Sequence, residues 1–120
     1  MADNPKQLPA AFWQSAAGVE PVREWLQSLE KDDRYEIGTA IKTVEFGWPV
    51  GMPACRPMGS GLWEVRATLA QGRIVRVLFC VHQGQMILLH GFMKKTQKTP
   101  KHDLDLARDR KRQIESGGTR

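Results

Sequence analysis

The amino-acid sequence predicts an α+β fold in which a short N-terminal strand and a helical hairpin pack on an antiparallel sheet of about four strands, followed by a C-terminal helix. Apolar residues recur at the three-and-four spacing of helices in the first half of the chain. From residue 62 the period changes to two, and glycine-containing turns separate the strand-like runs. A length of 120 residues fits one domain, so we expect a single domain over residues 1–120.

The N-terminal region begins with a polar stretch that contains two prolines, and we expect a flexible arm over residues 1–10. Residues 10–17 predict a short strand that ends at Gly18. Glu20 and Pro21 then begin a helix, because proline is tolerated at the first helical position and acidic charge suits the helix dipole.

Two apolar stripes predict the helical hairpin. The first stripe consists of Val22, Trp25, Leu26 and Leu29, and the second, in a helix over residues 32–46, consists of Ile37, Ala40, Ile41 and Val44. The sequence Lys-Asp-Asp at 31–33 is predicted to form the turn between the helices. Residues 47–61 contain four glycines and three prolines, which predicts an irregular loop of about 15 residues.

Alternating residues predict three strands, over residues 62–69, 73–81 and 86–92. In the first, Trp63, Val65, Ala67 and Leu69 share one face, and Glu64, Arg66 and Thr68 share the other. In the second, Val75, Val77, Phe79 and Val81 share one face, and Ile74, Arg76, Leu78 and Cys80 share the other. Short turns between these runs predict an antiparallel meander.

The last helix is predicted to begin at Thr99 as N-cap, with Pro100 at its first position. Its apolar stripe is thin and consists of Leu104, Ala107 and Ile114, so we expect this helix to be mobile or to need a partner. Residues 116–120 are predicted to be a tail.

The charge of the chain favours an anionic partner. Lysine and arginine number 18 against 13 acidic residues, which gives +5 at pH 7, and the excess lies beyond Cys55. Cys55 and Cys80 have no metal-ligand spacing, and with no apolar leader we expect them to be thiols in a cytoplasmic protein. No apolar run is long enough for a bilayer, so we expect no membrane association.

Cations on neighbouring strands are the main candidates for function. Arg66 and Arg76 interrupt two strands, and Lys94 with Lys95 follows the third. Such a cluster repels itself unless an anion joins it, and a phosphodiester fits because guanidinium groups bind its oxygens in pairs. A structural alternative is that one of these arginines pairs with Glu64 across the sheet.

Histidines and aromatic residues near the lysines are further candidates. His90 and His102 flank the lysines, and neighbouring cations favour the neutral imidazole, which suits a proton acceptor. A lone histidine is more often a packed or surface residue than a catalyst, so both readings stay open. Phe92 is the best candidate for stacking on a base.

The segments "GLWEVR", "RIVRVLF" and "LLHGFMKKTQKTP", followed by a polar helix, resemble the RelE/ParE superfamily of bacterial toxins, in particular the phage-type HigB-like branch. The resemblance covers about Val22 to Ile114. It implies a toxin of a type II toxin–antitoxin system that cleaves messenger RNA at the ribosome. It also implies a cognate antitoxin, encoded by the adjacent gene and often carrying a helix-turn-helix.

The resemblance implies roles for individual residues. Arg66 and Arg76 would bind the phosphate, Lys95 would stabilise charge or transfer a proton, and His90 or His102 would carry a proton. Lys94 would steer the RNA backbone with Lys98. The further substrate-binding residues would be Arg73, Phe92, Lys98, Lys101 and His102. No metal, cofactor or small-molecule ligand is implied.

The sequence departs from well-known relatives at two positions. Its only tyrosine, Tyr35, lies in the second predicted helix rather than late in the chain, and Glu64 stands where certain relatives place a lysine. Two alternatives therefore remain open, since a fold does not fix a function. One is a ParE-like inhibitor of DNA gyrase, and the other is a nucleic-acid-binding relative without catalytic activity.

Overall fold

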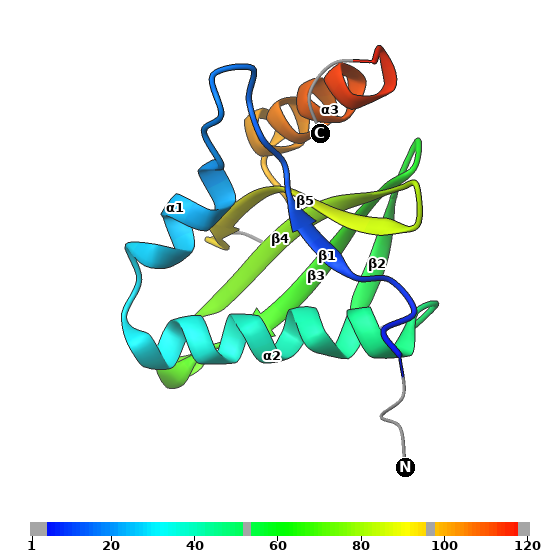
Figure 1. Ribbon diagram of the computed structural model, residues 1–120. Helices are drawn as coiled ribbons and strands as arrows, with labels where there is room; N and C mark the ends of the chain where they lie inside the picture. The colour runs from blue at the N-terminus through cyan, green and yellow to red at the C-terminus, as the bar shows by residue number, and fades with distance from the viewer. Residues whose placement is uncertain (1–4, 52–53, 96–97, 118–120) are drawn as a thin grey trace.

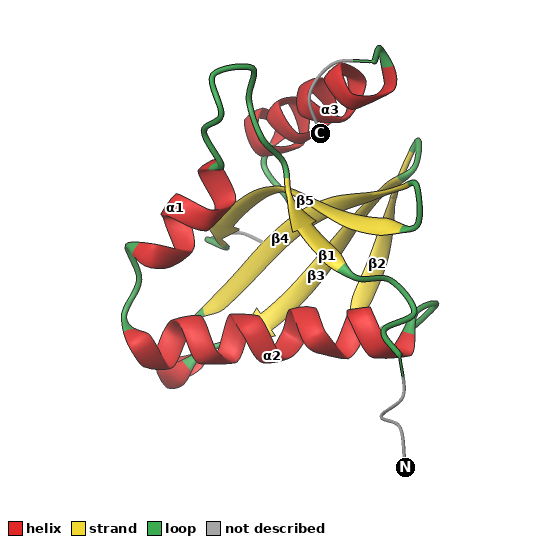
Figure 2. Ribbon diagram, in the orientation of Figure 1, coloured by secondary structure: helices red, strands yellow, loops and turns green. Residues whose placement is uncertain are grey.

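The computed structural model describes residues 5–51, 54–95 and 98–117. Its elements, in chain order, are β1 (Ala10–Phe12), α1 (Pro21–Gln27), α2 (Lys31–Gly47), β2 (Cys55–Gly59), β3 (Leu62–Thr68), the short 3-10 turn η1 (Ala70–Gly72), β4 (Ile74–His82), β5 (Gln85–Met93) and α3 (Lys101–Glu115). The α+β class, the two helices before the meander and the C-terminal helix are confirmed (Figures 1 and 2). The turn predicted at residues 31–33 is wrong, because these residues form the first turn of α2.

The strands form one five-stranded sheet in the order β1-β5-β4-β3-β2. The neighbouring pairs from β2 to β5 are antiparallel, as the meander predicts, whereas β1 pairs with β5 in parallel. The sheet is therefore mixed and has one strand more than the sequence predicts.

Helices cover both faces of this sheet (Figure 1). On the first face, α1 and α2 pack against a core that includes Ile37, Ile41, Val44, Val65, Val75, Val77 and Phe79. On the second face, α3 packs against a smaller core of Trp13, Leu62, Leu78, Cys80, Ile87, Leu89, Ala107 and Ile114. Because α3 covers only part of the second face, the rest of it is available for polar side chains.

The strand β2 corrects the prediction of an irregular loop over residues 47–61. Cys55 is buried and pairs with Val65, and Arg56 pairs with Glu64. Pro57 is tolerated because β2 lies at the edge of the sheet, where no further strand needs its missing N–H. The glycines and prolines of this segment indicate a loop, and the alternation of buried and exposed residues in β2 covers only five residues.

Within the stretch expected to be a flexible arm, residues 7–10 are hydrogen-bonded to α2, and residues 1–4 lie outside the described residues. The N–H groups of Gln7 and Leu8 donate to the Glu45 carbonyl oxygen at 2.8 and 2.9 Å, and Leu8 is 2% exposed. The Ala10 N–H donates to the Glu45 carboxylate at 2.7 Å. The end of α2 thus holds β1 in place, and β1 ends at Phe12 rather than near Gly18.

The start of α3 differs from the prediction by its cap. Pro100 occupies the N-cap position, and the Asp103 and Leu104 N–H groups donate to the Pro100 carbonyl oxygen, both at 3.1 Å. The Thr99 hydroxyl instead donates to Glu64 in β3. The thin apolar stripe of α3 is buried against the sheet, with Ala107 fully covered.

A β-bulge in β5 decides which side chains reach the second face. Leu78 pairs with His90 and Phe79 with Leu88, so Leu89 is an extra residue without a cross-strand partner. The Leu89 carbonyl oxygen accepts a hydrogen bond from Nη1 of Arg110 in α3 at 2.7 Å. Before the bulge the even-numbered residues face α2, and after it they face α3.

Gly91 allows α1 to approach the sheet closely. A Cβ atom at this position would lie 2.2 Å from Cζ3 of Trp25 in α1, which is far inside van der Waals contact. Gly38 in α2 is the opposite case, because nothing lies within 4 Å of the position that its Cβ would take.

We therefore predict that the two glycine substitutions change stability in opposite directions. G91A should lower the free energy of unfolding by about 1–3 kcal/mol through overpacking. G38A should raise it by about 0.5–1 kcal/mol, because alanine loses less conformational freedom in a helix. Urea unfolding of both variants measures this difference, and equal stability of G91A and the unsubstituted protein would contradict the close packing of α1.

Candidate functional site

Polar side chains lie in rows across the part of the second face that α3 leaves uncovered. One row consists of Arg56, Glu64, Leu78 and His90, which are successive cross-strand partners on β2, β3, β4 and β5. The next row consists of Arg66, Arg76 and Phe92. Cross-strand partners point to the same face, with Cα atoms about 5 Å apart, so Arg66 and Arg76 are neighbours.

Glu64 organises the first row. Its side chain is fully buried, and its Oε1 accepts from Nη1 of Arg76 at 2.7 Å and from Nη2 of Arg56 at 3.0 Å. Its Oε2 accepts the Thr99 hydroxyl at 2.5 Å. The structural alternative that one of the two strand arginines pairs with Glu64 is therefore confirmed for Arg76. Arg56 pairs with the same carboxylate oxygen.

Arg76 is the buried member of the cation cluster and Arg66 the exposed one. Arg76 is 7% exposed, and its burial lowers the pKa of the guanidinium, an effect that Glu64 opposes. The Nε atoms of Arg56 and Arg76 are buried and have no hydrogen-bond partner among the described residues. These guanidinium groups thus keep hydrogen-bonding capacity that the described protein atoms leave unused.

Lys94, and not Lys95, joins the arginines. The Lys94 N–H donates to the Ile74 carbonyl oxygen at 2.8 Å, which extends the β5 ladder by one residue. Partial desolvation lowers the pKa of the Lys94 ammonium, and Arg76, Arg66 and Arg56 lower it further. Within the described part of the chain, Lys95 is exposed and forms no such contact. We call Arg56, Arg66, Arg76 and Lys94 the cationic cluster.

His90 lies in β5, two residues before the cross-strand partner of Arg76, and its side chain contacts the first turn of α3. Its Nε2 lies 2.6 Å from Oδ1 of the buried Asp103, and its ring stacks on Phe92 with centroids 5.7 Å apart. Burial lowers the pKa of His90 more than Asp103 raises it. The neutral ring then donates from Nε2, by assignment from the hydrogen bond, and Nδ1 remains as an acceptor.

The remaining predicted site residues lie outside the cluster. Arg73 forms a bidentate ion pair with Asp33 of α2 at 2.8 and 2.9 Å, which holds it just before β4, next to α2 and away from the cationic cluster. His102 is exposed and 3.8 Å from Asp103, and Lys101 pairs with Asp105 at 2.8 Å. A role for Arg73 or His102 in substrate binding thus stays a prediction that their positions do not support.

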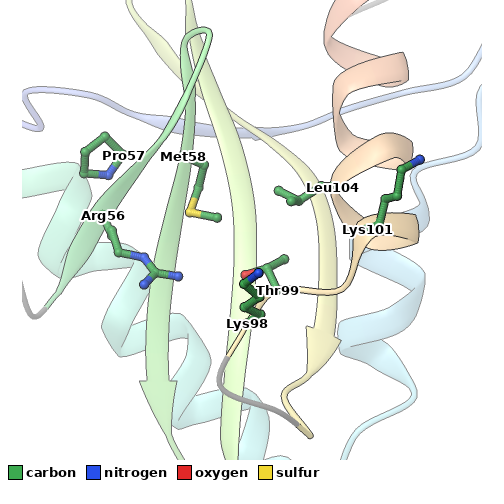
Figure 3. Close-up of a pocket in the computed structure, with 7 residues that line it drawn as sticks. All are labelled: Arg56, Pro57, Met58, Lys98, Thr99, Lys101 and Leu104. Carbon is green, nitrogen blue, oxygen red and sulfur yellow. The ribbon is translucent and has the colours of Figure 1, made fainter.

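Lys98 and Lys101 line an open groove of about 590 Å³ between β2 and the start of α3 (Figure 3). The other lining residues are Arg56, Pro57, Met58, Thr99 and Leu104. The sequence does not predict Arg56 as a site residue, because the glycines and prolines around it indicate a loop. Its only signal was the position opposite Glu64, which becomes visible once β2 and β3 are paired.

Other kinds of site find little support in the described residues. No three His, Cys, Asp or Glu side chains within the described ranges gather as a metal site would require. The thiols of Cys55 and Cys80 are free and buried, and burial raises the pKa of each to about 11, so neither is an activated nucleophile. Among the described residues, this face presents guanidinium and ammonium groups around a buried carboxylate.

We predict that the Glu64 carboxylate is essential for stability because it neutralises buried charge. E64A leaves Arg76 buried and unpaired and should lower the free energy of unfolding by about 3–5 kcal/mol. As a control, D33A breaks the half-exposed pair with Arg73 and should cost only about 1 kcal/mol. The double variant E64L/R76M should regain much of the loss. Urea unfolding measures all three, and equal losses for E64A and D33A would rule out the proposed role of Glu64.

Comparison with known protein families places this fold and site in context. Residues 24–112 match the family model described as "Phage derived protein Gp49-like (DUF891)", and this range includes the whole cationic cluster. Comparison with curated proteins gives no match. In the ranges that the structure describes, no helix has the length and apolar character needed to cross a membrane. The matched family is associated with RelE-like toxins. Because the match spans most of the sequence, the chain belongs to the Gp49-like family of phage-derived proteins.

Proposed function

We propose that the protein is the toxin of a type II toxin–antitoxin system, of the HigB-like branch, and that it cleaves messenger RNA on the ribosome without a metal ion. The observation that carries the proposal is the cationic cluster, in which the described residues place four cations around a single carboxylate. The excess positive charge calls for an anion, and guanidinium groups bind phosphate oxygens in pairs.

The proposed reaction is an internal transfer at phosphorus. The ribose 2′-oxygen attacks the adjacent phosphorus as the 2′-hydroxyl loses its proton, and the bond from phosphorus to the 5′-oxygen breaks. The products are a 2′,3′-cyclic phosphate and a free 5′-hydroxyl. Negative charge develops on the non-bridging oxygens, where Arg66 and Arg76 would stabilise it. The protein must also hold the attacking and leaving oxygens in line.

Two groups would transfer the protons in this mechanism. His90 is neutral near pH 7 and keeps Nδ1 as an acceptor, which suits a general base. Lys94 carries a lowered pKa within the cluster, which suits a group that stabilises charge and donates a proton to the leaving oxygen. Lys94 thereby takes the role that the family resemblance implied for Lys95. Glu64 is saturated by three donors and is assigned no proton transfer.

The cluster favours this function over its alternatives. An inhibitor of DNA gyrase would not need cations that converge on one face around a buried carboxylate. A binding protein without activity would need the cations but not a neutral histidine beside them. Phe92 stacks on His90 and lies in the row of Arg66 and Arg76, where it would contact a base of the bound RNA.

We predict that two adjacent lysines differ in their effect on cleavage. K94A should lower the rate of message cleavage on translating ribosomes by about 10²–10⁴-fold, the range for loss of a group that transfers a proton. K95A removes the same charge one residue away and should leave the rate nearly unchanged. Mapping of new RNA ends, with chemical detection of the cyclic phosphate, measures both variants.

Other outcomes of the same assay would reject the proposal. Equal loss of cleavage in K94A and K95A would mean that only net charge matters. Intact message together with a loss of DNA supercoiling would support the gyrase alternative. Cleavage products that carry a 3′-hydroxyl would contradict attack by the 2′-oxygen.

The proposed partner is an antitoxin encoded by the adjacent gene. An acidic segment of such a protein would neutralise the exposed Arg66 and the half-buried Lys94. We predict that co-expression of the adjacent gene restores growth to cells that the toxin arrests, and that the two proteins co-purify. Growth arrest that persists at equal expression of both genes would exclude this partner.

A further inference from the structure

The groove between β2 and α3 combines cations with apolar walls. Arg56 comes from β2, Lys98 comes from the segment that leads into α3, and Lys101 is the first residue of α3 (Figure 3). Between them lie Met58 and Leu104, whose apolar atoms also pack against the second core. A volume of about 590 Å³ lies within the range of small-ligand sites.

Arg56 connects this groove with the cationic cluster. Its Nη2 lies 3.0 Å from the Glu64 carboxylate that also holds Arg76, and its side chain remains 37% exposed on the groove side. Thr99 also belongs to both, since it lines the groove and donates to Glu64. A chain that is bound at the cluster and continues past Arg56 therefore enters the groove.

The lining of the groove indicates what kind of chain fits it. Arg56 and Lys98 match a polyanion, and Lys101 adds positive charge at the rim, where its ammonium points away from the groove and pairs with Asp105 (Figure 3). The described lining contains no acidic side chain. Met58, Pro57 and Leu104 offer apolar contact for a flat ring. Alternating phosphates and bases present this combination of charge and apolar surface. A double-stranded helix would keep its bases stacked away from such walls, whereas a single strand exposes them.

We infer that this groove is a second subsite for single-stranded RNA, which binds the nucleotide next to the scissile phosphate. Its base lies against Met58 and Leu104, and its phosphate lies between Arg56 and Lys98, with Lys101 contributing positive charge at the rim. The inference rests on the proposed function for the identity of the chain as RNA. It adds a binding site outside the reacting centre, with recognition by charge and apolar contact and little discrimination between bases.

A pair of charge reversals on α3 tests the electrostatic part. K101E and R112E each reverse an exposed cation that pairs with an aspartate of the same helix. The two positions are about 16 Å apart along the helix, beyond the screening length at physiological salt. The probe is a labelled 2′-O-methyl RNA of about ten nucleotides, which cannot undergo 2′-oxygen attack and matches the size of single-strand sites.

We predict that K101E weakens binding of this probe by about tenfold or more. It should also reduce the slope of log affinity against log salt concentration by at least about 0.7, the value for one single-strand phosphate contact. R112E should change the affinity less than about twofold, since it lies more than a screening length away. Fluorescence anisotropy across a salt series measures both. Equal losses in the two variants would overturn the inference.

A second pair of variants tests the apolar wall. M58E and M58K place opposite charges at the same half-buried position, so both should lose similar stability in urea unfolding. M58E should weaken RNA binding strongly, whereas M58K should retain or strengthen it. Equal affinities for M58E and M58K would overturn the inference even if both variants are folded.

The outcomes separate this inference from the proposed function. Groove-dependent RNA binding without message cleavage would retain the subsite and reject the nuclease. Cleavage on ribosomes that is unaffected by K101E and M58E would retain the nuclease and reject the subsite. A polyglutamate peptide that binds with the same K101E sensitivity, with no binding of the RNA probe, would assign the groove to an acidic protein segment and overturn the inference.

Discussion

The Glu64 carboxylate joins three parts of the molecule on the second face of the sheet. It holds Arg76 of β4, Arg56 of β2 and the Thr99 hydroxyl before α3, with none of its own side chain exposed. A buried carboxylate is stable only when paired and hydrogen-bonded, and a buried guanidinium has the same requirement. Each group therefore requires the other. The Glu64 carboxylate carries one negative charge and can neutralise only one of the neighbouring cations. This face therefore keeps a net positive charge, which favours an anion.

The bulge in β5 provides the other half of the site. One extra residue, Leu89, shifts the alternation so that His90, Phe92 and Lys94 lie on the same face of the sheet as the arginines instead of the face that α2 covers. The bulge interrupts the strand ladder at Leu89. Arg110 of α3 donates a hydrogen bond to the Leu89 carbonyl oxygen there. The basic character of α3 therefore has two origins. Arg110 supports the fold, whereas Lys101 at the start of the helix lines the groove.

The sequence predicted the features that depend on periodicity, and it could not predict those that depend on strand pairing. The stripes of α1, α2 and α3 and the faces of β3 and β4 follow from spacing within each element. The strand β2 was missed because Pro57 and the flanking glycines resemble a loop, and Arg56 was missed with it. Lys94 rather than Lys95 lies near the arginines because of the bulge in β5, and the alternation of residues in the sequence does not predict this bulge. The anchoring of Leu8 depends on Glu45, 37 residues later in the chain, and local sequence carries no sign of it.

The central claim is that side chains from separate strands form one phosphate site. Titration of the protein with an uncleavable 2′-O-methyl dinucleotide, followed by NMR of the arginine Nε and lysine Nζ resonances, tests it most directly. We expect the signals of Arg66, Arg76 and Lys94 to shift together with a single dissociation constant, while Arg73, held by Asp33, stays unchanged. Shifts confined to cations of α3, or separate dissociation constants for Arg66 and Lys94, would contradict a common site.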